Sequence, residues 1–135
     1  MILNNLRFHS LTGQSYLCQR SEQTLQIYSH NMTENPYAYS NYLLALDYFL
    51  NKPKEIILAQ PDQTPAPQFY QIIFNSFQPN KVVFQLSPGQ HSPLLDSALF
   101  QGKHAVAGKL TAYVCHNFTC SQPVCTQQEL KSLLA

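Results

Sequence analysis

The chain has 135 residues, of which 44% are hydrophobic and only 11% are charged, and its formal net charge is +1. This length suits one compact domain, or a small domain with an attached segment. Lysine and arginine do not cluster, which argues against a nucleic-acid partner because phosphate binding needs concentrated positive charge. A surface so poor in charge suggests instead that part of it faces another protein segment.

No apolar run approaches the roughly 18 residues of a membrane-spanning helix, so no membrane partner is expected. The start, Met1-Ile2-Leu3-Asn4-Asn5, lacks the basic segment and long apolar run of a secretion signal. We therefore expect a cytoplasmic protein. Its four cysteines are then expected to be reduced thiols rather than a disulfide framework.

The first fifty residues have the spacing of amphipathic helices. Leu3, Leu6 and Leu11 predict a short helix that ends at Gly13. A second helix is predicted by four apolar residues that share one face: Leu17, Leu25, Tyr28 and Met32. A third, with Asn35 as its cap and Pro36 in its first turn, has the clearest apolar stripe: Tyr39, Tyr42, Leu43, Leu46, Phe49 and Leu50.

The pattern changes after this stripe. The runs Glu55 to Ala59 and Lys81 to Leu86 are short, apolar and β-branched, which favours strands buried on both faces. A helix opened by Thr64 and Pro65 is predicted between them, with an apolar face of four residues: Phe69, Ile72, Ile73 and Phe77. Strand, helix and strand in about thirty residues predict one right-handed βαβ unit.

Three further elements are predicted toward the end of the chain. Ser92-Pro93 starts a short helix, and Thr111 to Cys115 form a third strand. Thr126 and Glu129 make a T-x-x-E capping box for a last helix through Leu134. The predicted fold class is α/β, with N-terminal helices followed by a small, three-stranded, mostly parallel sheet flanked by helices.

The predicted division of the chain is a helical segment over 1–52 and a small α/β domain over 53–135. Three helices with aromatic-rich stripes are not expected to enclose a core by themselves. The helical segment should therefore leave an apolar face, covered by another part of a larger protein, by the α/β domain or by a second copy of the chain.

Several stretches resemble one known family. They are "HSLTGQSYLCQRSEQTLQIY", "YAYSNYLLALDYFLNKPKEIILA", "PNKVVFQL" and "GKLTAYVCHNFTCSQPV", of which "AYVCHNFTCSQPV" is the most specific. The chain resembles the C-terminal end of YyaL-type proteins, which are related to spermatogenesis-associated protein twenty. The resemblance implies a thioredoxin-like domain and an (α/α)6 toroid, similar to that of N-acylglucosamine 2-epimerase, elsewhere in the full-length protein.

The resemblance carries few site residues onto this chain. Cys115 and Cys120 fit the family pattern Y-V-C-x4-C-x2-P, whereas Cys125 departs from it. No epimerase motif matches, so no catalytic residue is carried over. Any link to sugar chemistry would rest on fold analogy alone.

Three interpretations of the cysteine-rich stretch are open. Cys115, Cys120 and Cys125 with His116 or His104 would supply zinc ligands, but the C-x4-C-x4-C spacing is unusual for zinc. A redox pair of Cys115 and Cys120 requires a turn that folds the four intervening residues back. We favour ordinary packing, with both thiols reduced and Cys115 buried at the end of a core strand.

Other candidate sites are weaker. The five histidines are scattered and form no H-x3-H or HExxH pair. Asp62 follows the first strand, where α/β folds often bind ligands, but P-D-Q-T-P is also an ordinary turn. The helically spaced tyrosines Tyr37, Tyr39, Tyr42 and Tyr48 suit a sugar-binding face less well than a core or partner surface.

We therefore expect a non-catalytic structural and interaction module of a YyaL-like protein, with no cofactor and no enzymatic activity in isolation. Its expected partner is the remainder of the toroid or a second copy of the chain, as a homodimer. One alternative is a thiol–disulfide role through Cys115 and Cys120. The other is a part in a carbohydrate-active toroid whose catalytic residues lie outside this chain.

Overall fold

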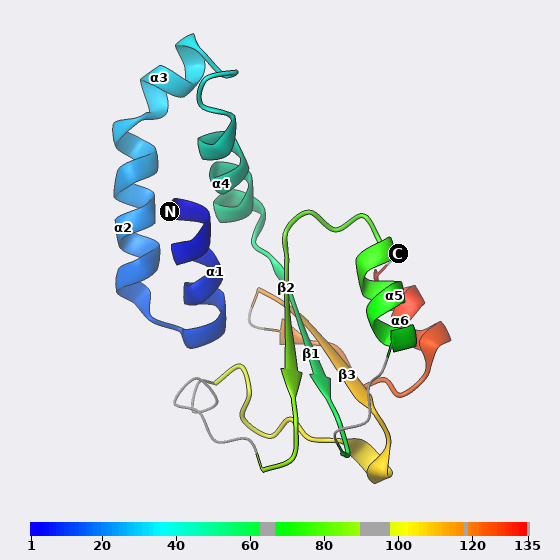
Figure 1. The fold of residues 1–135 in the computed structure, drawn as a ribbon. Coiled ribbons are helices and arrows are strands. Elements are labelled where there is room, and N and C mark those ends of the chain that lie inside the picture. The colour runs from blue at the N-terminus through cyan, green and yellow to red at the C-terminus, as the bar shows by residue number, and fades with distance from the viewer. Residues whose placement is uncertain (63–66, 90–97, 118, 135) are drawn as a thin grey trace.

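A computed structural model describes residues 1–62, 67–89, 98–117 and 119–134 of the chain. Helices α1 to α4 form one part, and a sheet with helices α5 and α6 on its opposite side forms the other (Figure 1). The predicted helix starts at Thr64-Pro65 and Ser92-Pro93 lie outside the described residues. No helix of the described part is both long and apolar enough to cross a membrane.

The first predicted helix is confirmed, whereas the second is divided at Tyr28, so that Met32 lies on a separate short helix. Helix α1 spans Ile2–Thr12, α2 spans Ser15–Ile27 and α3 spans Ser29–Glu34. Gly13 ends α1 in the left-handed conformation, at φ 70°, and its N–H donates a hydrogen bond to the His9 carbonyl. A residue without a side chain adopts this backbone conformation at little cost, so the predicted stop at Gly13 is confirmed.

Helix α4 spans Ser40–Asn51 and begins four residues later than the predicted start at Pro36. The Oδ1 atom of Asn35 accepts a hydrogen bond from the N–H of Ala38, and the residues between Asn35 and Ser40 form a turn. Asparagine side chains commonly stabilise such turns in competition with a helix. The predicted stripe is therefore helical from Ser40 onward, and Leu50 at its end is exposed.

The helical part encloses a core of its own, which corrects the expectation that it would not. One buried cluster joins α1, α2, α3 and α4, and its members are Leu6, Leu25, Met32, Ala45 and Tyr48. Tyr39, Tyr42 and Leu46 of the stripe pack against this cluster, as does Val82 of the sheet. The α-helices thus bury part of their apolar surface against one another and part against the sheet.

The sheet has four strands rather than three: β1 (Lys54–Ala59), β2 (Lys81–Leu86), β3 (Thr111–His116) and β4 (Thr119–Cys120). Their order is β2-β1-β3-β4. Strands β1 and β2 are parallel and are joined through α5 (Pro67–Asn75), which confirms the predicted strand–helix–strand unit.

The sheet is mixed, so the prediction of a mostly parallel sheet is wrong. Strand β3 pairs antiparallel with β1, and β4 pairs antiparallel with β3. The register places Ala59 opposite both Leu86 and Thr111, so β3 begins level with the carboxyl-terminal ends of β1 and β2. Because the chain re-enters the sheet at that end, β3 runs antiparallel to β1.

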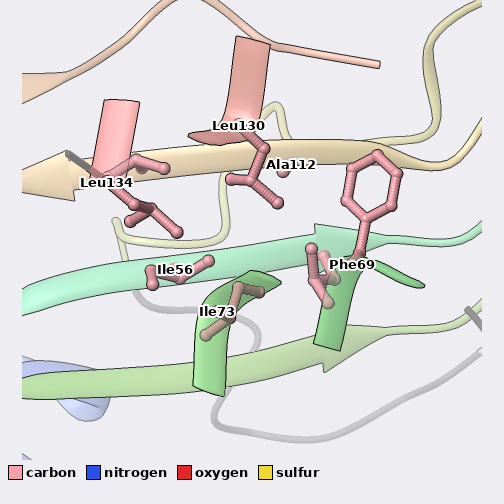
Figure 2. Close-up of a cluster of buried hydrophobic side chains, with 8 residues drawn as sticks. Ile56, Phe69, Ile73, Ala112, Leu130 and Leu134 are labelled. Atoms are coloured by element: carbon pink, nitrogen blue, oxygen red, sulfur yellow. The ribbon is translucent and has the colours of Figure 1, made fainter. Parts of the chain in front are cut away.

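Alternation along β1 divides the sheet into two faces. Ile56 and Leu58 lie on the face covered by α5 and α6 (Gln127–Leu134), and Figure 2 shows Leu130 and Leu134 above the strands. The complete cluster on this face is Ile56, Leu58, Phe69, Ile73, Ala112, Val114, Leu130 and Leu134. Ile57, Ala59 and Tyr113 lie on the other face in a separate cluster with Phe100.

The ends of the outer helices explain two details of this layer. The carboxylate of Glu129 accepts hydrogen bonds from the N–H and hydroxyl of Thr126, and the Glu129 N–H donates to the Thr126 hydroxyl. This reciprocal arrangement confirms the predicted capping box. Phe77 is 91% exposed, contrary to its predicted place on an apolar helix face, because α5 already ends at Asn75.

Leucines at two positions should separate this core from the surface. Leu130 is fully buried between α6 and the sheet, whereas Leu50 is 65% exposed at the end of α4. We expect Leu130→Ala to lower the free energy of unfolding by about 2–5 kcal/mol, since it leaves a cavity. The matched change Leu50→Ala should alter it by less than about 0.5 kcal/mol in urea denaturation. Equal losses would contradict the packing described.

Candidate functional site

The helical part and the sheet meet around a cleft of about 420 Å³. Its helical wall includes Leu6, His9 and Ser10 of α1 together with Tyr48 and Phe49 of α4. The wall formed by the sheet carries Glu55 of β1, Cys115 of β3 and Cys120 of β4. Glu55, Cys115 and Cys120 therefore share one concave region, and binding and catalytic sites usually lie in such regions.

Cys115 and Cys120 are joined by a disulfide, with their Sγ atoms 2.11 Å apart. The prediction of reduced thiols is wrong for this structure. Antiparallel pairing of β3 and β4 sets the two cysteines directly opposite each other, with Cα atoms 3.9 Å apart. Asn117 adopts a left-handed conformation, φ 50°, which asparagine tolerates better than most residues and which turns the chain back. The condition for sulfur contact stated from the sequence is thus met.

The two sulfurs differ in their access to solvent. Cys115 is 1% exposed, which confirms its predicted burial at the end of a core strand, whereas Cys120 is exposed on the short edge strand. A reagent in solution can therefore approach the disulfide from the Cys120 side. Such asymmetry decides which sulfur an incoming thiolate attacks.

Glu55 is the residue of this region that the sequence analysis missed as a site candidate. The β1–β3 register pairs it with Cys115, so the carboxyl and the disulfide occupy neighbouring positions on one face of the sheet. A signal was present: Glu55 is a lone acidic residue at the start of an otherwise apolar run, in phase with the buried Ile57 and Ala59. A charged carboxylate at such a partly buried position is costly unless a neighbouring group stabilises it.

Burial raises the pKa of the Glu55 carboxyl from 4.5 to about 7, against smaller opposing effects of a backbone hydrogen bond and of His116. Burial likewise raises the pKa of the Tyr48 hydroxyl to about 12, and the nearby negative charge of Glu55 adds to this. The Tyr48 hydroxyl lies 3.3 Å from the hydroxyl of Ser10, within hydrogen-bonding distance. Glu55 is therefore a carboxyl that exchanges its proton near neutral pH.

The candidate zinc ligands are not gathered around one point. His116 Nε2 lies 3.4 Å from the Asn51 carbonyl, and Cys125 Sγ lies 3.4 Å from the Thr111 hydroxyl. Cys115 and Cys120 are bonded to each other. His104, the other possible ligand, has Nδ1 3.1 Å from the Gly102 carbonyl. Within the described residues, no three His, Cys, Asp or Glu side chains form a group that could hold a metal ion.

The remaining sequence candidates lie apart from the cleft or within the packing. Asp62 is exposed beyond the end of β1, and Tyr37 is exposed in the turn before α4. Tyr39 and Tyr42 pack with Tyr28 in an aromatic cluster, with ring centroids 5.0–6.0 Å apart. Cys18 of α2 is partly buried against the helical core and also reaches the cleft.

Comparison with known proteins finds similar sequences. Over 134 residues, the chain is 28% identical to spermatogenesis-associated protein 20 of Rattus norvegicus and 29% identical to that of Homo sapiens. It is similar to a segment of spermatogenesis-associated protein 20. The alignments cover 97% of this chain but 17% of the relatives, so the chain spans about a sixth of their length.

This similarity supports homology to spermatogenesis-associated protein 20 and agrees with that part of the resemblance drawn from the sequence motifs. No protein-family model matches the chain. No solved structure matches it either.

The Glu55 carboxyl should make stability depend on pH. Its folded pKa, about 7, exceeds the ordinary 4.5 expected in the unfolded chain, so the folded state holds the proton more tightly. The free energy of unfolding then falls as pH rises through this interval, and the penalty is complete above it. Glu55→Gln should remove the penalty. We expect a gain of about 1–2 kcal/mol at about pH 8, an amount reduced for partial solvent contact, and little gain at about pH 5.

Urea denaturation of the oxidised chain at the two pH values measures this difference. Glu34→Gln, an exposed carboxyl on α3, is the matched control and should show no such dependence. An equal effect of Glu55→Gln at both pH values would contradict burial of an ionisable carboxyl at this position.

Proposed function

We propose that the chain is a non-catalytic structural and interaction module of a YyaL-like, spermatogenesis-associated protein 20-like protein, and that it acts in the cytoplasm. Its helices would complete the helical array that the resemblance implies, an (α/α)6 toroid next to a thioredoxin-like domain. Homology to a segment of much longer relatives supports this role. The relationship fits a family member whose role is not catalytic, and no residue of this chain is proposed to catalyse sugar chemistry.

The observation that carries the proposal is the set of large apolar side chains that the helical part leaves exposed. Although α1, α2 and α4 share a core, each also exposes large apolar side chains: Phe8, Tyr16, Ile27, Leu44 and Leu50. Ile27 is 72% exposed and Leu44 is 56% exposed, on different helices. Several such residues on neighbouring helices are typical of a surface that another protein segment covers.

The occupant proposed for this surface is the set of helices from the rest of the full-length protein. Helices pack best against other helices with complementary apolar ridges, and charge is scarce throughout the chain. The relatives are about six times as long as the chain, so ample sequence exists in them to supply these helices. A second copy of the chain is the competing occupant. Nucleic acid and membrane are not proposed as partners.

A binding experiment with matched variants tests this role. The 135-residue chain should co-elute with human spermatogenesis-associated protein 20 from which the matching segment has been deleted. The double variant Ile27→Lys/Leu44→Lys should weaken this association by about tenfold or more, because two apolar contacts are replaced by charges. Gln23→Lys/Asn41→Lys, which changes exposed polar residues on the same two helices, should bind as the unaltered chain does.

Two results would contradict the proposal. Unchanged binding by the Ile27→Lys/Leu44→Lys variant, with its helical circular dichroism intact, would show that this surface is not the interface. Sedimentation showing a stable dimer of the 135-residue chain that does not bind the deleted relative would identify a second copy as the occupant instead.

A further inference from the structure

Four side-chain positions form a row across one face of the sheet. The strand registers place Val82 of β2 opposite Glu55, Glu55 opposite Cys115, and Cys115 opposite Cys120. Directly opposed residues in neighbouring strands have Cβ atoms roughly 5 Å apart, so each side chain in the row is within reach of the next. The Glu55 carboxyl therefore flanks the buried Cys115 on the side opposite Cys120.

The row lies in the wall of the cleft between the helical part and the sheet. Cys115, Cys120 and Glu55 all line this cleft of about 420 Å³. Its other walls are largely apolar and include Leu6, Phe49 and Leu99. A structural disulfide buried in packed side chains would have no such space beside it. This one has an exposed sulfur, Cys120, and room for a small or peptide ligand next to it.

We propose that the Cys115–Cys120 disulfide is a thiol–disulfide exchange site for a dithiol in a cysteine-containing peptide, and that Glu55 supplies the proton to the Cys115 sulfur. This inference shares the proposed cytoplasmic location with the structural role above, but it concerns the cleft rather than the exposed faces of the helices, so different experiments test the two.

The exchange can be written with all atoms and electrons assigned. One thiolate of the peptide dithiol attacks the exposed Sγ of Cys120, and the disulfide breaks with its electron pair on Sγ of Cys115. The Cys115 thiolate then takes the proton of the Glu55 carboxyl. The second thiolate of the peptide attacks the peptide sulfur bonded to Cys120, and the Cys120 thiolate leaves and is protonated by water. The peptide dithiol is oxidised to a disulfide, and Cys115 and Cys120 are reduced to thiols.

The order of attack follows from exposure rather than from sequence. Cys115 is 1% exposed at the end of β3, whereas Cys120 is exposed, so an external thiolate meets Cys120 first and Cys115 is the leaving sulfur in the first step. A thiolate formed at so buried a position is costly without a proton or a positive partner. Glu55 is the nearest acid by strand register, and its proton transfers the negative charge from the buried sulfur to a less buried carboxylate, which regains a proton from water.

The protonation state of Glu55 suits this task. Burial raises its pKa to about 7, so the proton is available and exchangeable near neutral pH. His116 on β3 and Tyr48 on α4 interact electrostatically with Glu55. The other titratable groups that line the same cleft are His9 on α1 and, on loops, Lys52 and Lys103. In the cytoplasmic location proposed above, a persistent disulfide is more often catalytic or redox-sensing than structural.

Reaction with oxidised glutathione tests which sulfur is accessible. In Cys115→Ser, the remaining Cys120 thiol should form a mixed disulfide with glutathione. In Cys120→Ser, the remaining Cys115 thiol should react at least about tenfold more slowly, because the folded chain covers it. Mass spectrometry of peptides separates these products from modified Cys18 or Cys125. Equal reactivity of the two cysteines in folded variants would overturn the assigned order of attack.

The pH dependence of reduction by dithiothreitol in the unsubstituted chain tests Glu55 and does not depend on the cysteine variants folding. Corrected for the fraction of reagent thiolate, the rate should fall roughly three- to tenfold between about pH 6 and about pH 8, as Glu55 loses its proton. Glu55→Gln should give a flat profile, whereas the exposed control Glu34→Gln should keep the fall.

Two outcomes would overturn the proposal. The same fall in Glu55→Gln would show that Glu55 does not supply the proton. A reduction rate that is independent of dithiothreitol concentration and equal to the rate of global unfolding would show that the disulfide is structural and closed to exchange.

Discussion

The remainder of the fold depends on the burial of strand β1 on all sides. β1 has a hydrogen-bonded neighbour at each edge, and the last four of its six residues, through Ala59, are buried. Its alternating side chains enter two different clusters, one under α5 and α6 and one toward the helical part. A strand in this position fixes the plane of the sheet, the face on which each outer helix packs and the place where the α-helices meet the sheet.

The same constraint explains why the cleft carries an acid beside a disulfide. Glu55 lies at the less buried start of β1, where the sheet meets the end of α4, and side-chain alternation directs it to the face of Ile57 and Ala59. Tyr48 of α4 lines the same cleft, and its hydroxyl is sensitive to the charge of Glu55. The acid is therefore positioned by the pleat of the strand rather than by a loop.

Much of the local structure could be predicted from the residues. The β-branched runs of β1 and β2, the stop at Gly13 and the Thr126–Glu129 capping box are determined by neighbours close in sequence. The direction of β3 could not be predicted, because it depends on which end of the strands the long connection from β2 reaches before the chain re-enters the sheet. The division of the chain near residue 52 remains a prediction.

The disulfide and Glu55 were not predicted for related reasons. The expectation of reduced thiols rests on the compartment inferred for the chain, whereas the bonding of Cys115 and Cys120 is determined by a turn at Asn117 that sets them opposite each other. Glu55 becomes notable only once the register sets it beside Cys115. Both features arise from cross-strand pairing, which joins residues without a fixed separation in the sequence.

Strand β2 occupies one edge of the sheet, and within the described residues no further strand pairs with it. Its sequence, KVVFQL, combines high β-propensity with few charges. An open edge of this composition is a template on which strands of other molecules can add, and Lys81 at its start is the kind of charge that opposes such addition. The edge strand is therefore the segment from which aggregation of a partly unfolded chain would begin, and solubility during folding would depend on how quickly β2 pairs with β1.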